Sequence, residues 1–275
     1  MMSSNLFLQQ PWRYACEPFQ IAPHVYYVGN RDVGSYLIDT GAGLVLIDQG
    51  YAETLYHLLE SIRRLGFDPR DIRALLVSHA HVDHCGGTRL LKEYTGAPVW
   101  ISREDMAMYQ KDVRLVHLGN ENWIDFQPDY FYDYTRPFCM GNLVLEVVHT
   151  PGHTPGTCSF FWTDQDAHGE KYRMGLYGGI GLNTQQEDFL RQYPDWPKSL
   201  LGDFIRSIRS CQNRTVDITL PSHPNHTAPA LFDWPESHDI SRFVNRQVWS
   251  NMLQKRLEMA LALENSRREK ESGSV

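Results

Sequence analysis

Four side chains that commonly bind metal ions lie within six positions of the sequence. The segment LLVSHAHVDHCGG, from Leu75 to Gly87, holds His79, His81, Asp83 and His84 in the order His-x-His-x-Asp-His. Residues two apart in an extended segment point the same way, so His79 and His81 can reach one ion. Asp83 and His84 follow as the chain turns, and they are expected to face a second, neighbouring ion. This pattern at this spacing is a strong indication of a metal centre.

The rest of the chain should supply two more ligands if the centre holds two metal ions. Imidazole and carboxylate suit Zn²⁺, and hydroxide held between two zinc ions is a nucleophile available near neutral pH. HTPGHTPGT offers His149 and His153, and LPSHPNHT offers His223 and His226. We expect His153 and His223 to be ligands, because each lies in a tight loop just past a predicted strand. His149 and His226 are expected to support the ligands or to lie at the surface.

A closed structural zinc site is the main alternative for the cluster. Structural sites favour thiolate ligands, and Cys85 is the one cysteine near the histidines. The five cysteines are widely spaced, without a C-x-x-C pair, which indicates free thiols. The spacing therefore favours a catalytic use of the cluster.

The surrounding elements alternate between strands and helices. Apolar runs bounded by Gly, Asn and Asp predict the strands, and apolar residues at helical spacing predict the helices. The predicted strands are 21–29, 34–39, 43–50, 72–78, 97–102, 142–150, 156–163, 172–179 and 216–222. The predicted helices are 52–66, 86–96, 102–111, 199–211 and about 240–268. This order predicts an α/β layered fold in which two similar halves pack face to face. We expect a single domain over 1–275, with its core at about 19–232.

Between Val113 and Pro137 no periodic pattern is present, which predicts a long loop. Its aromatic residues argue against disorder. We expect Trp123, Phe126 and Tyr130 to close over the apolar part of a substrate. The alternative is a loop that only packs on the body of the protein.

Composition and charge exclude several kinds of partner. The formal net charge is −7 and the basic residues are scattered, so nucleic acid is not expected as a partner. No apolar run approaches the roughly 20 residues that cross a bilayer, so no membrane is expected. No signal peptide is evident at the start. This indicates a cytoplasmic location for the chain as written, or a periplasmic or secreted one if a signal peptide was removed. The oligomeric state is not predicted.

Three motifs resemble a known family when they are taken in order. SHAHVDHCGG, TPGHTPGT and PSHPNH are similar to the metal-binding motifs of the metallo-β-lactamase superfamily, over about residues 19–225. The resemblance implies a four-layer αββα sandwich with the site at one edge of the two sheets. The predicted C-terminal helix would extend this fold.

One position departs from the pattern of most hydrolases in that superfamily. They carry an aspartate that bridges the two metals after the strand that follows PGHTPG, whereas Gly179 stands there in GLYGGIGLN. Either the second metal is lost, or the chain resembles the third subclass of metallo-β-lactamases, which has no bridging residue. PFQIAPHVYYVG, DPRDIRALLVSHAHVDH, LPSHPNHT and the extended hairpin at 163–172 are similar to that subclass. That similarity implies one zinc ion at His79, His81 and His153 and a second at Asp83, His84 and His223.

A second departure concerns the substrate. Serines that help to fix the substrate carboxylate in the third subclass are replaced here by Ile180, Gly181 and Leu182. Asn183 and Thr184 are the nearest polar substitutes. We expect Ile180, Asn183 and Thr184 to contact the substrate.

These features together predict a zinc-dependent hydrolase acting on a small molecule. Metal-bound hydroxide would attack a strained or activated carbonyl, with Asp83 orienting it as the catalytic carboxylate. The resemblance favours a β-lactam ring as the substrate. A lactone or thioester is the alternative, because fold and metal chemistry do not dictate the substrate. A non-catalytic metal-binding protein is the competing hypothesis from another class.

Overall fold

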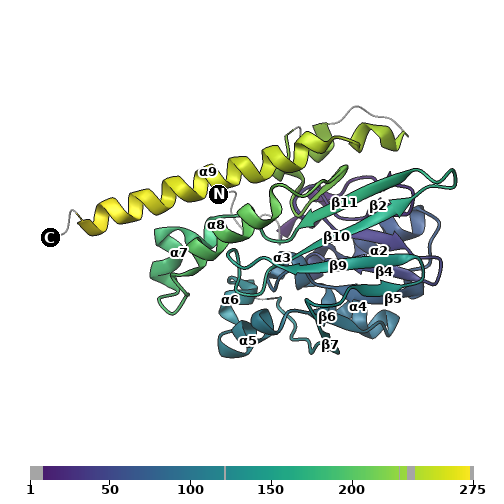
Figure 1. Cartoon of the computed structure of the whole chain (residues 1–275). Coiled ribbons are helices and arrows are strands. Elements are labelled where there is room, and N and C mark those ends of the chain that lie inside the picture. Colours follow the sequence, from purple (N-terminus) through teal and green to yellow (C-terminus); the bar gives the residue numbers. More distant parts are fainter. Residues whose placement is uncertain (1–8, 121, 229, 234–238, 273–275) are drawn as a thin grey trace.

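Two β-sheets lie face to face in the computed structural model, which describes residues 9–120, 122–228, 230–233 and 239–272 (Figure 1). The first sheet runs in sequence order, and its strands are β1 (Phe19–Ala22), β2 (Val25–Tyr27), β3 (Tyr36–Asp39), β4 (Leu44–Ile47), β5 (Ile72–Leu76), β6 (Val99–Ile101) and β7 (Tyr130–Phe131). The second sheet has the order β12 (Ile218–Pro221), β11 (Lys171–Tyr177), β10 (Cys158–Gln165), β9 (Leu143–His149) and β8 (Phe138–Met140).

Helices cover the outer faces of both sheets. The α-helices are α2 (Leu55–Arg64), α3 (Val82–Cys85), α4 (Thr88–Thr95), α5 (Arg103–Lys111), α6 (Arg114–His117), α7 (Glu187–Gln192), α8 (Leu200–Cys211) and α9 (Arg246–Ser272). Short 3₁₀ turns are η1 (Pro11–Tyr14), η2 (Ala52–Thr54), η3 (Pro69–Asp71), η4 (Asn183–Gln185), η5 (Pro224–His226), η6 (Leu231–Asp233) and η7 (Ile240–Phe243). Figure 1 shows α9 running beside α8 along one side of the molecule.

Three apolar clusters define the layers. The cluster between the sheets joins residues such as Ile47 of β4 and Phe160 of β10, both fully buried. A second cluster packs α2, α4 and α5 on the first sheet, and a third packs α8 and α9 on the second sheet. Strands such as β4 and β12, which are buried on both faces, are apolar on both sides, whereas β9 alternates between buried and exposed residues. The expected αββα sandwich is thereby confirmed, including its C-terminal helix.

The structure corrects three of the predicted elements. The strand expected over 21–29 is two strands, β1 and β2, because Pro23 has no N–H to donate and the chain turns there. The expected loop at 113–137 contains α6 and the two-residue strand β7, both too short to show a period. The last helix begins at Arg246, not at residue 240, because the Asn245 side chain accepts a hydrogen bond from the Gln247 backbone N (3.0 Å) and caps its start.

The sheets bring the polar segments of the sequence to one edge. β4 and β5 are parallel neighbours, so the residues that follow them meet at the same end of the first sheet. β11 and β12 are parallel neighbours in the second sheet, and the loops after them reach the same edge. Within the described ranges no helix is both long and apolar enough to cross a membrane.

Candidate metal centre

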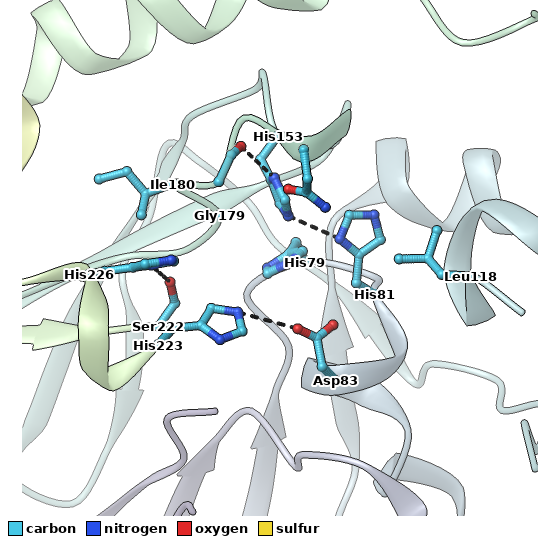
Figure 2. A pocket seen from close by; sticks show the side chains of 12 residues that line it. His79, His81, Asp83, Leu118, His153, Gly179, Ile180, Ser222, His223 and His226 are labelled. Atoms are coloured by element: carbon cyan, nitrogen blue, oxygen red, sulfur yellow. Dashed lines mark hydrogen bonds and ion pairs between the residues drawn. The ribbon is translucent and has the colours of Figure 1, made fainter. Parts of the chain in front are cut away.

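Six side chains converge at this edge in two groups of three. His79, His81 and His153 form one group, and Asp83, His84 and His223 form the other. Within each group the ligand atoms lie within 4.8 Å of one another. Figure 2 shows these side chains around a common cavity. The grouping is the one that the sequence led us to expect, and metal binding by it stays a prediction.

The candidate ligands come from three separate segments of the chain. His79 and His81 follow β5, and the helix α3 that begins next carries Asp83 and His84. The β9–β10 loop supplies His153, and the end of β12 leads into His223. The two groups are compact, because His81 Nδ1 lies 3.0 Å from His153 Nε2 and His84 Nε2 lies 3.3 Å from His223 Nε2.

The first group has the properties of a metal site. The His79 Nε2 atom is buried and has no hydrogen-bond partner in the described part of the chain. An unpaired buried polar atom is costly, and a metal ion would satisfy it. Burial lowers the pKa of His79 and His153 well below the ordinary value, and lowers that of His81 to about 4. The group therefore holds neutral imidazoles, which is the form that binds zinc.

The second group is held together by charge. Burial by itself would raise the pKa of Asp83, but His84 and His223 outweigh it and hold that pKa well below its usual range. Burial lowers the pKa of His84, and the carboxylates of Asp83 and Asp48 outweigh that effect and raise it to about 10. Asp83 is thus a carboxylate, and a cation between it and the histidines is favoured. A metal ion would take the place of the proton on His84.

Hydrogen bonds at Nδ1 orient three of the histidines. His84 Nδ1 donates to Asp48 Oδ2 (2.8 Å), His153 Nδ1 to the Gly181 carbonyl (2.8 Å), and His223 Nδ1 to the Asp32 carbonyl (2.7 Å). In each ring Nε2 is then free to act as the metal ligand. Sequence reasoning missed these supports, because each acceptor is distant from its histidine in the chain.

Asp48 is a supporting residue with an unusual backbone. Its φ of 57° lies in the left-handed region, which is costly for a residue other than glycine. Its carboxylate accepts hydrogen bonds from the Ser78 backbone N (2.8 Å), the Ser78 hydroxyl (2.7 Å) and His84. The strain is offset by these three bonds, which join the end of β4 to the end of β5.

Asp105, the third residue of α5, joins two of the ligand loops. Its carboxylate is fully buried and accepts hydrogen bonds from the Ala80 backbone N (2.7 Å), the Gly156 backbone N (2.6 Å) and the Thr154 hydroxyl (2.9 Å). Ala80 lies between the ligands His79 and His81, while Thr154 follows His153. Asp105 therefore fixes the spacing of the whole first group.

Replacing Asp105 with Asn should weaken the first metal group selectively. Asparagine has one acceptor oxygen in place of two and brings its own N–H groups toward the donors. Loss of such outer support typically costs 10–100-fold in metal affinity, so we expect zinc affinity at this group to fall by about that factor. Competition against a chromogenic chelator measures it. Asp129→Asn is the matched control, because Asp129 also accepts a backbone N–H, from Val99, but lies beside β7. Equal zinc affinity in D105N and wild type would contradict this role.

The Gly179 loop packs directly against His153. A Cβ atom at Gly179 would lie 2.3 Å from His153 Cδ2 and 2.7 Å from His153 Cβ, far inside normal contact. At this position most hydrolases of the superfamily that the sequence resembles are expected to carry a bridging aspartate, but here a side chain cannot fit while His153 stays in place. The described residues at this loop therefore provide no bridging ligand.

A cavity of about 220 Å³ opens over the two groups (Figure 2). Besides ligands from both groups, its walls are Leu118, Gly179, Ile180, Gly181, Asn183, Ser222 and His226. Of the expected substrate contacts, Ile180 and Asn183 are thus at the cavity. The Ile180 side chain is 1% exposed and packs in the apolar cluster under α8 and α9, so it supports the wall.

The structure places the other four expected substrate contacts elsewhere. Thr184 is fully buried, and its hydroxyl donates to the His153 carbonyl (2.8 Å). Phe126 is 1% exposed in the cluster on the first sheet, Trp123 packs against that cluster, and Tyr130 stacks on Trp100 at the sheet edge. The aromatic loop is therefore packed on the body of the protein, as in the alternative: Phe126 is buried there, while Tyr130 stays 53% exposed.

Leu118 is a cavity residue that the sequence did not reveal. Its φ of 49° is left-handed, and Gly119 follows with a φ of 86°. Figure 2 shows Leu118 beside His81. A leucine in this conformation is strained, and such strain clusters at functional sites. The one signal in the sequence is the Leu-Gly-Asn turn directly after the apolar residues of α6.

Comparisons with known proteins agree with this geometry. A model of the metallo-beta-lactamase superfamily matches residues 28–167. The hydroxyacylglutathione hydrolase GloC of Haemophilus influenzae is 28% identical over 184 residues, which cover 64% of this chain and 76% of that protein. An N-acyl homoserine lactonase of Bacillus thuringiensis is 26% identical over 161 residues, which cover 48% of this chain and 58% of that protein. This chain thus spans little more than half of the lactonase.

Solved structures match over almost the whole chain. The metallo-beta-lactamase GOB-18 from Elizabethkingia meningoseptica has a TM-score of 0.80 at 27% identity and covers 93% of this chain and 94% of its own. BJP-1, a subclass B3 metallo-beta-lactamase of Bradyrhizobium japonicum, has a TM-score of 0.81 at 22% identity. The match covers 97% of this chain and 98% of BJP-1, and it shows that the two proteins share the fold. The expected resemblance to the third subclass is confirmed. The chain belongs to the metallo-β-lactamase superfamily of zinc-dependent hydrolases.

Proposed function

We propose that the chain is a dinuclear zinc hydrolase that opens a strained or activated carbonyl compound, with a β-lactam as the first candidate substrate. The observation that carries the proposal is the pair of three-residue ligand groups on one cavity, with no bridging side chain between them among the described residues. The fit to GOB-18, a metallo-beta-lactamase, over 93% of the chain supports the choice of β-lactam.

The two ligand groups have different roles in the proposed reaction. Zinc, when bound, polarises a carbonyl oxygen and lowers the pKa of a water molecule. His79, His81 and His153 hold one end as neutral ligands. Asp83 lines the cavity as a carboxylate, 3.3 Å from both His84 and His223. It can therefore accept a hydrogen bond from the attacking water and orient that water toward the substrate.

The cavity wall supplies both apolar and polar contacts. Leu118 stands beside the first group and can pack on the apolar part of an acyl compound. Asn183 offers an amide on the side of Gly181. The cavity of about 220 Å³ has room for a reacting carbonyl and its ring.

A lactone or thioester is the second candidate, and a specific observation favours it. Ile180 and Leu182, both apolar and buried, stand where the third subclass places serines for the substrate carboxylate. Two relatives are named as a lactonase and a hydroxyacylglutathione hydrolase. A substrate without a carboxylate beside the reacting bond would not need those serines.

Turnover with and without metal tests the proposal. Zinc-loaded protein is assayed on nitrocefin, an N-acyl homoserine lactone and an acyl-glutathione thioester. We expect nitrocefin hydrolysis that falls at least about 100-fold after EDTA treatment and returns on adding zinc, because the attacking water depends on the metal. Hydrolysis of only the lactone or the thioester would replace the first candidate by the second. Tight zinc binding without turnover of any compound would identify a non-catalytic metal-binding protein and refute the proposal.

A further inference from the structure

A sixth histidine, His226, enters the cavity next to the second ligand group, which is one of the two groups that together contain five histidines and Asp83. It ends the 3₁₀ turn η5, which begins directly after His223. His226 lines the cavity together with His223, which directly precedes the turn. The two ring centroids are 4.8 Å apart, and Figure 2 shows His226 reaching in beside Ser222.

His226 is poised as a hydrogen-bond donor. It belongs to neither ligand group. Its Nδ1 lies 3.4 Å from the hydroxyl of Ser222, a residue only 2% exposed. When that hydroxyl donates to Nδ1, the proton of the neutral ring is on Nε2. No side chain or backbone group of the described residues is bonded to Nε2, so its N–H is available to a ligand.

Arg256 of α9 adds positive charge near His226, although it does not line the cavity itself. No Lys or Arg is among the described residues that line the cavity. The Arg256 guanidinium is partly buried, and its charge acts on His226. Its one polar contact in the described part of the chain is the Met259 sulfur at 4.0 Å, and no carboxylate pairs with it there. A partly buried cation without a counter-ion favours an anionic ligand nearby.

We propose that His226, oriented by Ser222, donates a hydrogen bond from Nε2 to a carboxylate of the substrate, with Arg256 adding positive potential. The substrate class is then an acyl compound that carries a free carboxylate near the bond that is cleaved. This inference rests on the proposed function. The substrate carboxylate would then lie beside η5. In the third subclass, serines at the positions of Ile180 and Leu182 help to bind that carboxylate, and this chain lacks them.

Binding of a small carboxylate tests the inference without turnover. Titration calorimetry of the zinc-loaded protein uses succinate, with dimethyl succinate as the neutral probe. We expect His226→Ala to weaken succinate binding at least about tenfold, which is about 1.4 kcal/mol. His226→Gln keeps an N–H donor and should restore much of the affinity. His168→Ala is the matched control, because His168 is exposed in the β10–β11 turn. Equal succinate affinity in H226A and wild type would overturn the inference.

Turnover then links the subsite to the reaction. The measured quantity is the kcat/KM ratio for benzylpenicillin over its methyl ester, and we expect H226A to reduce this ratio about tenfold or more. Zinc content should match that of wild type; a fall would show that His226 is a ligand and refute the inference. If wild type hydrolyses neither compound nor the lactone and thioester, the proposed function fails, while the succinate titration still decides the role of His226.

Discussion

Replacing Gly179 with Asp is expected to destroy the first metal group instead of adding a bridging ligand. A Cβ atom there would lie 2.3 Å from His153 Cδ2, so the His153 ring must move. Two hydrogen bonds oppose that movement, one from His153 Nδ1 to the Gly181 carbonyl and one from Thr184 to the His153 carbonyl, each 2.8 Å long. Because the ligand cannot shift without breaking its own support, we expect kcat/KM to fall at least about 100-fold and zinc at this group to be lost.

Two further variants separate bulk from charge in this experiment. Gly179→Ala adds only the Cβ atom and should lose zinc as G179D does. Gly181→Ala is the control from the same loop, because its Cβ would stay 3.4 Å from His153 and would meet mainly the end of the Asn183 side chain at 2.7 Å. Zinc content per chain, measured by elemental analysis, and kcat/KM are determined for G179D, G179A and G181A. Full zinc content in G179D together with retained activity would show that His153 does not need this close packing.

Asp83→Asn is expected to produce the second large loss. The carboxylate supplies the negative charge of the second group, and asparagine has none to offer a cation or a water molecule. Loss of a group that orients or deprotonates the nucleophile costs about 10²–10⁴ in rate, and we expect kcat to fall within that range. The fold should persist, because the Asp83 side chain is 17% exposed and its ionic partners are His84 and His223.

A charge-matched control completes the Asp83 experiment. Asp188→Asn removes the same charge from a side chain that is 82% exposed on α7, and it should leave kcat unchanged. Steady-state kinetics, zinc content and circular dichroism are measured on both variants. Wild-type kcat in D83N would show that these six residues are not the catalytic site.

Four of the six candidate ligands were predictable because their chemistry is local in the sequence, whereas His153 and His223 were assigned from separate motifs and from the family resemblance. His79, His81, Asp83 and His84 share one short segment, and their spacing matches the geometry of a strand that turns into a helix. Their supports were not predictable. Asp48 and Asp105 reach the ligand loops only because β4 lies beside β5 and α5 begins next to the β9–β10 loop, and one sequence does not specify those neighbours.

The layers of the fold were predictable, whereas the role of the aromatic loop was not. Strand and helix periods identified the longer elements, since each buries a regular apolar face, but they missed the short elements α3, α6, α7, β7 and β8. Phe126 and Tyr130 have no such period, and composition alone does not distinguish a ring that covers a substrate from one that packs in a core. The Phe126 side chain is only 1% exposed, which shows that it packs in the core and does not cover the substrate site. Leu118, with no aromatic character, stands at the cavity instead.

The most direct test of a two-metal centre without a bridge is anomalous diffraction at the zinc edge from crystals grown with zinc. We predict two peaks on the cavity, one among His79, His81 and His153 and one among Asp83, His84 and His223, with no side chain that ligates both metal ions. A single peak, or a peak ligated by residues outside these two groups, would contradict the account.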